Sequence, residues 1–190
     1  GLHISWIVIA AIISLSLSAH FTATQPEWVR STVWGIAVLT AVLFFISLLA
    51  HELAHALVAR AQGIPVHSIT LFALGGIARI EKEASSARNE FLMAIVGPLT
   101  SLAIGFAALG AATAMGWSPA GRSDSILGAV LGWLGSINVL LAAFNVIPAF
   151  PLDGGRVLRA LLWAIYGSAG RATRHAAVVG QVVSVGFIVL

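Results

Sequence analysis

A long apolar run, from Val33 to Ala61, constrains this chain more than any other feature of its sequence. At ~1.5 Å per residue, a helix over this run exceeds the ~30 Å hydrocarbon core of a bilayer, so it tilts or extends past the interface. Hydrophobic residues make up 59% of the chain and charged residues only 9%, whereas soluble domains average about 25% charged residues. The chain cannot cover a water-facing surface. Soluble globular, disordered and collagen-like proteins are therefore excluded.

Five further apolar runs predict an α-helical integral membrane protein with about six transmembrane helices in a single transmembrane domain, residues 1–190. The first run has no basic region before it and no small-residue cleavage site, so it is interpreted as a span rather than a signal peptide. Because the chain opens at Gly1 and ends inside an apolar run, we expect both termini to be truncated. The predicted spans are approximately 4–20, 33–61, 91–117, 126–147, 156–168 and 175–190.

The segment between the second and third runs has a different pattern. Val66 to Phe72 alternates roughly at period two, and a similar run, Ile77 to Glu81, follows Gly75 and Gly76. A Gly-Gly pair between two such runs is typical of a hairpin loop. We therefore predict a small membrane-associated β-hairpin or sheet over approximately 64–82, with the glycine pair in its loop.

Basic residues predict the orientation of the chain. The net charge is +3, but its basic residues lie in short loops, where they report membrane topology and indicate no nucleic-acid binding. The loops on the opposite side carry only Arg30 and Arg122, so the N-terminus and the β region are expected in the cytoplasm. Arg171 and Arg174 contradict six full spans, unless that pair is an exception or the short fifth run does not cross. The basic residues on the predicted cytoplasmic side are Arg60, Arg79, Lys82, Arg88, Arg156 and Arg159.

Three ionisable residues lie within the second apolar run, at His51, Glu52 and His55. A charged residue at mid-membrane costs at least ~2.5–3.5 kcal/mol on insertion scales, so these side chains need a function or a partner. The two histidines are four residues apart on one helix face, where both can reach one Zn²⁺. Glu52 lies beside them, placed for a water molecule rather than for the metal. The alternatives are a polar contact between helices and a proton path, as in a transporter.

Asp153 is the best candidate for a third ligand. Zinc hydrolases usually have three protein ligands and a water, and the chain has no cysteine. Asp153 lies beside a hydrophobic span in a segment, Phe144 to Arg156, that two prolines and two glycines interrupt. Irregular backbone at membrane depth is tolerated only against protein or a water-filled cavity. The alternative is a plain cytoplasmic turn in which Asp153 caps the next helix.

These two motifs, HELAH in a membrane helix and NVIPAFPLDGGR later in the chain, resemble those of the site-2 proteases, the intramembrane zinc metalloproteases of peptidase family M50. The resemblance runs through nearly the whole chain and includes Leu74 to Ala78 and Gly97-Pro98. The short insert between HELAH and Gly97 has no room for a PDZ domain. It resembles the branch that carries cytoplasmic cystathionine-β-synthase-type (CBS) regulatory domains, which this chain does not include.

The resemblance implies that His51, His55 and Asp153 bind one zinc ion per chain and that Glu52 is the general base. Similar ligands also accept iron or cobalt. It further implies a multi-pass protein of a bacterial or archaeal cell membrane. Both motifs lie toward the Arg-rich loops, so we expect the active site toward the cytoplasmic side. The implied partners are the lipid bilayer and a transmembrane protein substrate, such as a membrane-bound regulator of the anti-sigma-factor type. Asn145 could donate to the oxyanion or act as a polar contact between helices.

A substrate helix hides its peptide bonds in hydrogen bonds and must unwind before attack. An exposed strand can take the freed backbone by β-augmentation, and the region from Leu71 to Ile80 is the candidate strand. Its alternative role is a structural cover for the mouth of the cavity. The residues expected to bind substrate are Leu74, Gly75, Gly76 and Ile77.

Two other functions compete with intramembrane proteolysis. A non-enzymatic membrane transporter or metal-binding protein could use the same charged cluster, although neither needs a base at Glu52 beside two ligands. Another membrane protease with an HExxH helix could act on a soluble or prenylated peptide. Such enzymes generally use a glutamate as third ligand, and the Asp-Gly-Gly context of Asp153 argues against it.

Overall fold

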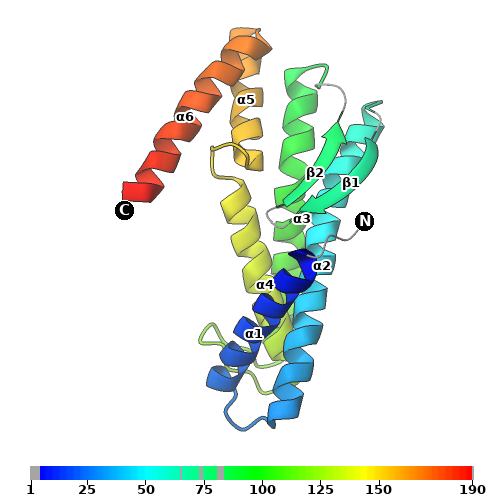
Figure 1. Ribbon diagram of the computed structural model, residues 1–190, viewed down its shortest axis with the longest axis vertical. Helices are drawn as coiled ribbons and strands as arrows, with labels where there is room; N and C mark the ends of the chain where they lie inside the picture. The colour runs from blue at the N-terminus through cyan, green and yellow to red at the C-terminus, as the bar shows by residue number, and fades with distance from the viewer. Residues whose placement is uncertain (1–4, 65, 73–74, 81–83, 190) are drawn as a thin grey trace. The chain divides into compact units, whose positions relative to one another are not determined.

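The computed structural model describes residues 5–64, 66–72, 75–80 and 84–189. Over these ranges the chain forms α-helices along most of its length and two short β-strands between the second and third helices (Figure 1). In chain order the elements are α1 (Ser5–Thr24), α2 (Arg30–Ala61), β1 (Val66–Phe72), β2 (Gly75–Ile80), α3 (Ala87–Ala114), α4 (Ile126–Asn145), α5 (Asp153–Tyr166) and α6 (Ala169–Val189).

Four helices in the described part of the chain are long and apolar enough to cross a membrane: α1 over Ile7–Thr24, α2, α3 and α4. The prediction of about six transmembrane helices is therefore wrong. The predicted fifth span falls on α5, whose 14 residues reach only ~21 Å at ~1.5 Å per residue. The predicted sixth span falls on α6, where Arg171, Arg174 and His175 occupy the first turns and shorten the apolar stretch.

Large apolar side chains remain exposed along these four helices. Ile12 is 61% exposed, Ile46 57%, Phe106 62% and Leu140 61%. Leaving a side chain of this kind in water costs roughly 1.5–3 kcal/mol relative to burying it, whereas lipid tails are as apolar as the side chains themselves. The chain is accordingly an integral membrane protein.

The two strands pair with each other in a two-stranded sheet. The predicted hairpin, with Gly75 and Gly76 in its loop, is nevertheless wrong, because both glycines belong to β2 and begin it. Glycine accepts extended backbone as readily as a turn, so a Gly-Gly pair does not by itself locate a loop. Residues 73–74, between the strands, lie outside the described residues.

The chain divides into two compact units. The first unit comprises Gly1–Leu49, Thr70–Ile77 and Ser101–Val139, and the second comprises Ala50–Ile69, Ala78–Thr100 and Leu140–Leu190. That residues 1–190 act as one protease domain stays a prediction.

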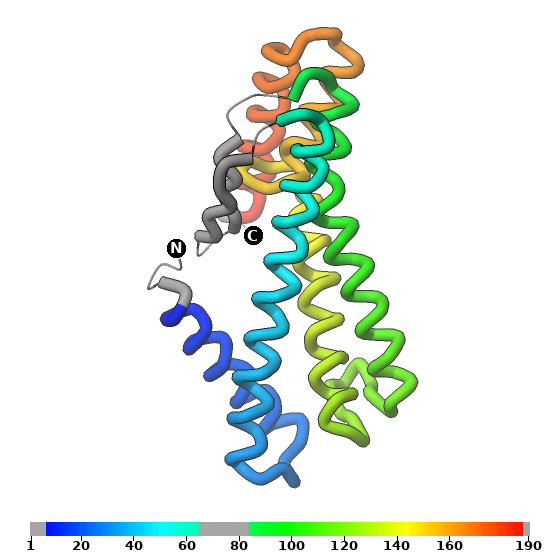
Figure 2. The backbone as a smooth tube through the Cα atoms, turned by 90° about the vertical axis from the view of Figure 1, so that its right-hand side faces the viewer, coloured from blue at the N-terminus to red at the C-terminus, as the bar shows by residue number. Residues whose placement is uncertain are grey.

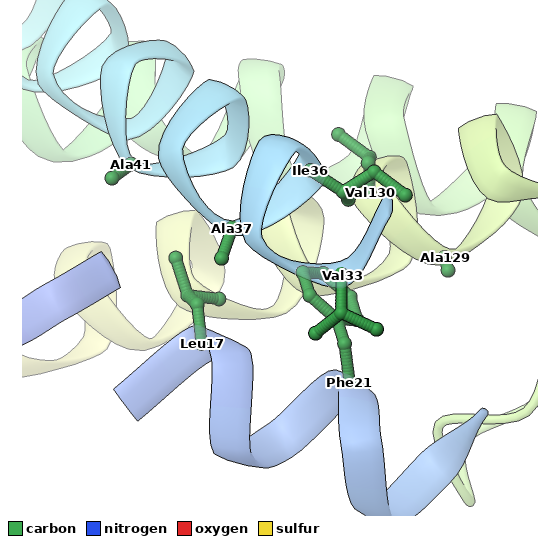
Figure 3. Close-up of a cluster of buried hydrophobic side chains, with 8 residues drawn as sticks. All are labelled: Leu17, Phe21, Val33, Ile36, Ala37, Ala41, Ala129 and Val130. Atoms are coloured by element: carbon green, nitrogen blue, oxygen red, sulfur yellow. The ribbon is translucent and has the colours of Figure 1, made fainter. Parts of the chain in front are cut away.

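The first unit has a core in which α1, α2 and α4 meet (Figure 3). Several of its members are alanines, which let the helix backbones approach closely and pack through van der Waals contact, as membrane helices do. The buried residues of this core are Leu17, Phe21, Val33, Ile36, Ala37, Ala41, Ala129 and Val130.

Glycines bring α3 and α4 together in the same unit, where the two helices run side by side (Figure 2). A Cβ placed on Gly135 would lie 2.8 Å from the backbone oxygen of Gly105 and 2.8 Å from the backbone nitrogen of Leu109. Any larger residue would therefore push the helices apart.

In the second unit, α5 and α6 pack against each other as a helical hairpin (Figure 1). Gly167 ends α5 in the left-handed conformation, with φ 63° and ψ 11°, and its N–H donates to Trp163 O. This backbone conformation favours glycine, because a Cβ would clash there. The tight turn leads directly into α6.

Candidate metal centre

The two histidines of α2 lie one turn apart and are both buried. Their Nε2 atoms are 3.2 Å apart, and the rings meet edge to face with centroids 4.9 Å apart. The four-residue spacing of His51 and His55 puts both side chains on one face of the helix. The Nε2 atoms of His51 and His55 therefore point toward a common position.

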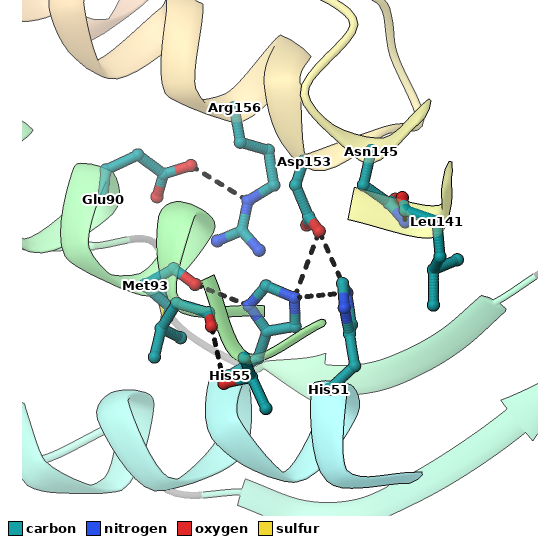
Figure 4. Close-up of polar contacts among 10 residues, drawn as sticks. His51, His55, Glu90, Met93, Leu141, Asn145, Asp153 and Arg156 are labelled. Carbon is teal, nitrogen blue, oxygen red and sulfur yellow. Dashed lines mark hydrogen bonds and ion pairs between the residues drawn. The ribbon is translucent and has the colours of Figure 1, made fainter. Parts of the chain in front are cut away.

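Asp153 joins the histidines from a separate helix, as its first residue (Figure 4). Its Oδ2 atom lies 3.2 Å from His51 Nε2 and 3.2 Å from His55 Nε2. The N-cap of α5 is Leu152, and no side-chain hydrogen bond caps this helix. The carboxylate of Asp153 is thus directed at the imidazoles rather than at the helix terminus.

The glycines after Asp153 allow the first turn of α5 to press against the preceding loop. A Cβ on Gly154 would overlap the backbone oxygens of Val146 and Ile147, and one on Gly155 would lie 2.9 Å from the carbonyl carbon of Ala149. A larger residue at either position would displace α5. Gly154 and Gly155 therefore keep the start of α5, and with it the carboxylate of Asp153, close to the loop that follows α4.

The hydrogen bond of His55 to α3 determines which nitrogen carries its proton. His55 Nδ1 lies 2.6 Å from Met93 O, and a carbonyl oxygen can only accept, so Nδ1 donates. In the neutral imidazole, Nε2 then presents a lone pair toward Asp153 and His51. A lone pair facing a carboxylate oxygen requires a proton or a cation between them. A hydrogen bond from the other ring nitrogen to a backbone oxygen, as His55 makes to Met93, is typical of metal-bound histidine.

The three ligand atoms fit a tetrahedral zinc ion. All of them lie within 4.8 Å of one another, and each measured separation is 3.2 Å. Ligands held ~2.0–2.1 Å from zinc at tetrahedral angles are about 3.3 Å apart. Gly97 of α3 packs on the same atoms, since a Cβ there would overlap His55 Nε2 and lie 2.6 Å from His51 Nε2. The absence of a side chain at Gly97 therefore leaves room for the two Nε2 atoms where they meet Asp153 Oδ2.

The carboxyl group of Asp153 is ionised at neutral pH. In the metal-free protein, where a proton lies between these groups, burial by itself raises the pKa of Asp153, but the hydrogen bonds and charges of His51 and His55 outweigh burial and lower that pKa to about 2. An ionised carboxylate is the form that binds a divalent metal.

Glu52 follows His51 in α2 and is partly buried. Among the described residues, the group whose ligand atoms converge consists of His51, His55 and Asp153. Glu52 is not a member of this group. Its role as general base stays a prediction.

The other predicted site residues stay predictions as well. Asn145 ends α4, and its Nδ2 donates to Leu141 O at 3.0 Å, so one of its N–H groups is used within its own helix. Gly75, Gly76 and Ile77 belong to β2 and to the first unit. Leu74 lies outside the described residues.

Sequence reasoning missed an ion-pair cluster in the same unit. Glu90, in the first turn of α3, is 1% exposed, and its Oε1 lies 3.1 Å from Arg156 Nε and 3.2 Å from Arg159 Nη2. The signal was present, because a carboxylate at the start of an apolar span needs a partner. Met93 was missed because its contribution is a backbone oxygen, which no residue pattern identifies.

Comparison with known proteins agrees with the site. The family model for Peptidase family M50 matches residues 39–123 and 118–190, which confirms the resemblance. The protein named "Putative zinc metalloprotease sll0528" of Synechocystis is 41% identical over 93% of this chain and 45% of its own length. The "Putative zinc metalloprotease Rip3" of Mycobacterium tuberculosis is 40% identical over 100% of this chain and 48% of its own length. The chain thus spans about half the length of these curated relatives.

A solved structure is also similar. The site-2 protease from Methanocaldococcus jannaschii superposes with a TM-score of 0.58 at 30% sequence identity. The match covers 93% of this chain and 74% of that protein's chain. The similarity therefore extends over the described helices and is not confined to the two motifs.

Proposed function

Since the chain belongs to peptidase family M50, we propose that it is the membrane domain of an intramembrane zinc metalloprotease. Its reaction is the hydrolysis of a peptide bond within or near a transmembrane helix of a membrane-protein substrate. The observation that carries this proposal is the set of mutual 3.2 Å separations among His51 Nε2, His55 Nε2 and Asp153 Oδ2. The cofactor is zinc, one ion per chain.

The chain's own residues divide the work of the reaction. His51, His55 and Asp153 would hold the metal, and the hydrogen bond to Met93 keeps the Nε2 lone pair of His55 available for it. When bound, zinc polarises a carbonyl oxygen and lowers the pKa of water from 15.7 toward ~7. The carboxylate of Glu52 accepts the proton of the attacking water and returns it to the departing amine.

Substrate binding requires an unwound segment of the substrate helix, because its peptide groups are otherwise hydrogen-bonded within that helix. In the described part of the chain, β2 pairs with β1 alone, which leaves its other side without a strand partner there. An extended substrate could pair with it through main-chain groups. In this proposal Gly75, Gly76, Ile77 and the neighbouring Leu74 bind substrate, and Asn145 donates to the oxyanion.

Removing the metal tests the proposed activity. We expect the purified chain in proteoliposomes to cleave a model transmembrane peptide whose helix is loosened by Gly or Asn. A chelator should abolish cleavage, because it removes the zinc from His51, His55 and Asp153. Added zinc should bind the same three residues again and restore cleavage. Peptide products are identified by mass spectrometry. A chain that binds zinc but cleaves no loosened helix would favour the transporter or metal-binding function instead.

The membrane orientation is a further part of the proposal. With four crossings, every basic residue after α4 falls on the same side as the loop between α2 and α3, as the positive-inside rule requires for the cytoplasm. This arrangement resolves the conflict posed by Arg171 and Arg174, because α5 is too short to cross. The metal ligands would then lie toward the cytoplasmic side of a bacterial or archaeal membrane.

Cysteine labelling checks the orientation, since the chain has no cysteine of its own. Ser85, in the loop before α3, and Ala120, in the loop between α3 and α4, are both exposed. In sealed cells, Ala120→Cys should react with an impermeant maleimide, and Ser85→Cys should react only after permeabilisation. The reverse pattern would invert the proposed topology.

A further inference from the structure

We propose that Glu90 is a positioning residue for the metal centre. Its ion pairs with Arg156 and Arg159 set the distance between Asp153 and the two histidines. The Glu90 side chain is 2% exposed, and its Oε1 atom accepts from Arg156 Nε at 3.1 Å (Figure 4). The same Oε1 atom faces Arg159 Nη2 at 3.2 Å. A carboxylate this buried is stable only when paired, and both of its partners come from α5.

The two arginines share the first turns of α5 with Asp153. They follow it at intervals of three residues, and residues three apart on a helix are neighbours on its surface. Arg156 is about one turn from Asp153, whereas Arg159 is six residues from it and lies roughly 120° around the helix axis. No side chain caps the start of α5, and the ion pairs of Glu90 with Arg156 and Arg159 restrain its first turns.

The same turn of α3 also restrains the histidines. Met93 lies three residues after Glu90, and its backbone oxygen accepts the hydrogen bond from His55 Nδ1 at 2.6 Å. One turn of α3 is therefore connected to the histidine helix through Met93 and to the aspartate helix through Glu90. A shift of α5 along α3 changes the distance from Asp153 Oδ2 to both Nε2 atoms. The histidines belong to α2 and pack against Gly97 of α3, so a shift of α5 does not carry them along.

Glu90→Gln keeps the shape and an acceptor oxygen but removes the negative charge. We expect the dissociation constant for zinc to rise by ~10–100-fold, the usual cost of changing a residue that supports a metal ligand. The chain with Co²⁺ in place of zinc should also show a changed visible absorption spectrum, because that spectrum reports coordination geometry. Glu27→Gln is the matched control, since Glu27 is exposed between α1 and α2, and both readouts should match wild type.

A structural role alone gives a different result. In that case Glu90→Gln would lower the unfolding temperature of the metal-free protein, while the zinc dissociation constant and the Co²⁺ spectrum of the folded fraction would equal those of wild type. Such a result would overturn the proposal. Neither readout uses peptide cleavage. A wild-type chain that binds no zinc would refute the zinc site on which the inference rests, whereas unchanged binding in Glu90→Gln refutes only the role of Glu90.

If Glu90→Gln does not fold, two milder variants test whether Glu90 positions the metal centre. Arg156→Lys and Arg159→Lys each keep the charge but lose the planar guanidinium that holds a carboxylate in a fixed geometry. Because Arg156 is closer to Asp153 along α5, its replacement should raise the zinc dissociation constant more than that of Arg159. Equal effects, or the reverse order, would contradict positioning through the first turn of α5.

Discussion

Glu52→Gln should lose peptide cleavage while the chain keeps its zinc and its fold. The amide is nearly isosteric with the carboxylate, so packing in α2 changes little, but it cannot accept a proton. General-base catalysis typically contributes ~10²–10⁴-fold, and we expect a fall in kcat of that size. The measurement is the rate of cleavage of a loosened transmembrane peptide in proteoliposomes, together with the zinc content per chain.

The control for this variant is Glu27→Gln, which makes the same chemical change at an exposed position outside the second unit. It should cleave at the wild-type rate. His51→Ala should behave differently from Glu52→Gln and lose both activity and metal. If Glu52→Gln held zinc and cleaved at near wild-type rate, the proposed mechanism would be incorrect.

Asp153→Ala should lose most of its zinc. A four-ligand zinc site binds with roughly 10–16 kcal/mol, so one ligand contributes about 3 kcal/mol, and its loss weakens binding by on the order of 10²-fold. The two remaining imidazole nitrogens, 3.2 Å apart, would leave the metal with fewer protein ligands than zinc hydrolases use. Competition with a chromophoric chelator measures the change in the dissociation constant.

Asp124→Ala is the matched control for that variant. Asp124 is exposed in the loop between α3 and α4, and its removal should leave zinc binding unchanged. Retention of wild-type zinc affinity by Asp153→Ala would exclude Asp153 as a ligand. The role proposed for Glu90 would then lose its basis as well, because Glu90 acts through Asp153.

Local spacing determined the features that sequence analysis predicted correctly. The apolar runs mark α1 to α4 because a bilayer demands length and hydrophobicity along one continuous segment. The proximity of His51 and His55 follows from the helical repeat alone. The predicted fifth span was wrong, because the apolar run that forms α5 is too short to cross a bilayer. The glycines of β2 were misplaced because glycine fits both strand and turn.

The tertiary structure alone determined how distant segments converge. Asp153 is 102 residues from His51, and the sequence motifs could nominate it but could not supply a distance. The backbone contact of Met93 with His55 left no pattern in the sequence. Gly97 and Glu90 were visible in the sequence, but their partners were not. The physical reason is that helical geometry places neighbours within one segment, whereas packing, glycine clearance and buried ion pairs decide which segments meet.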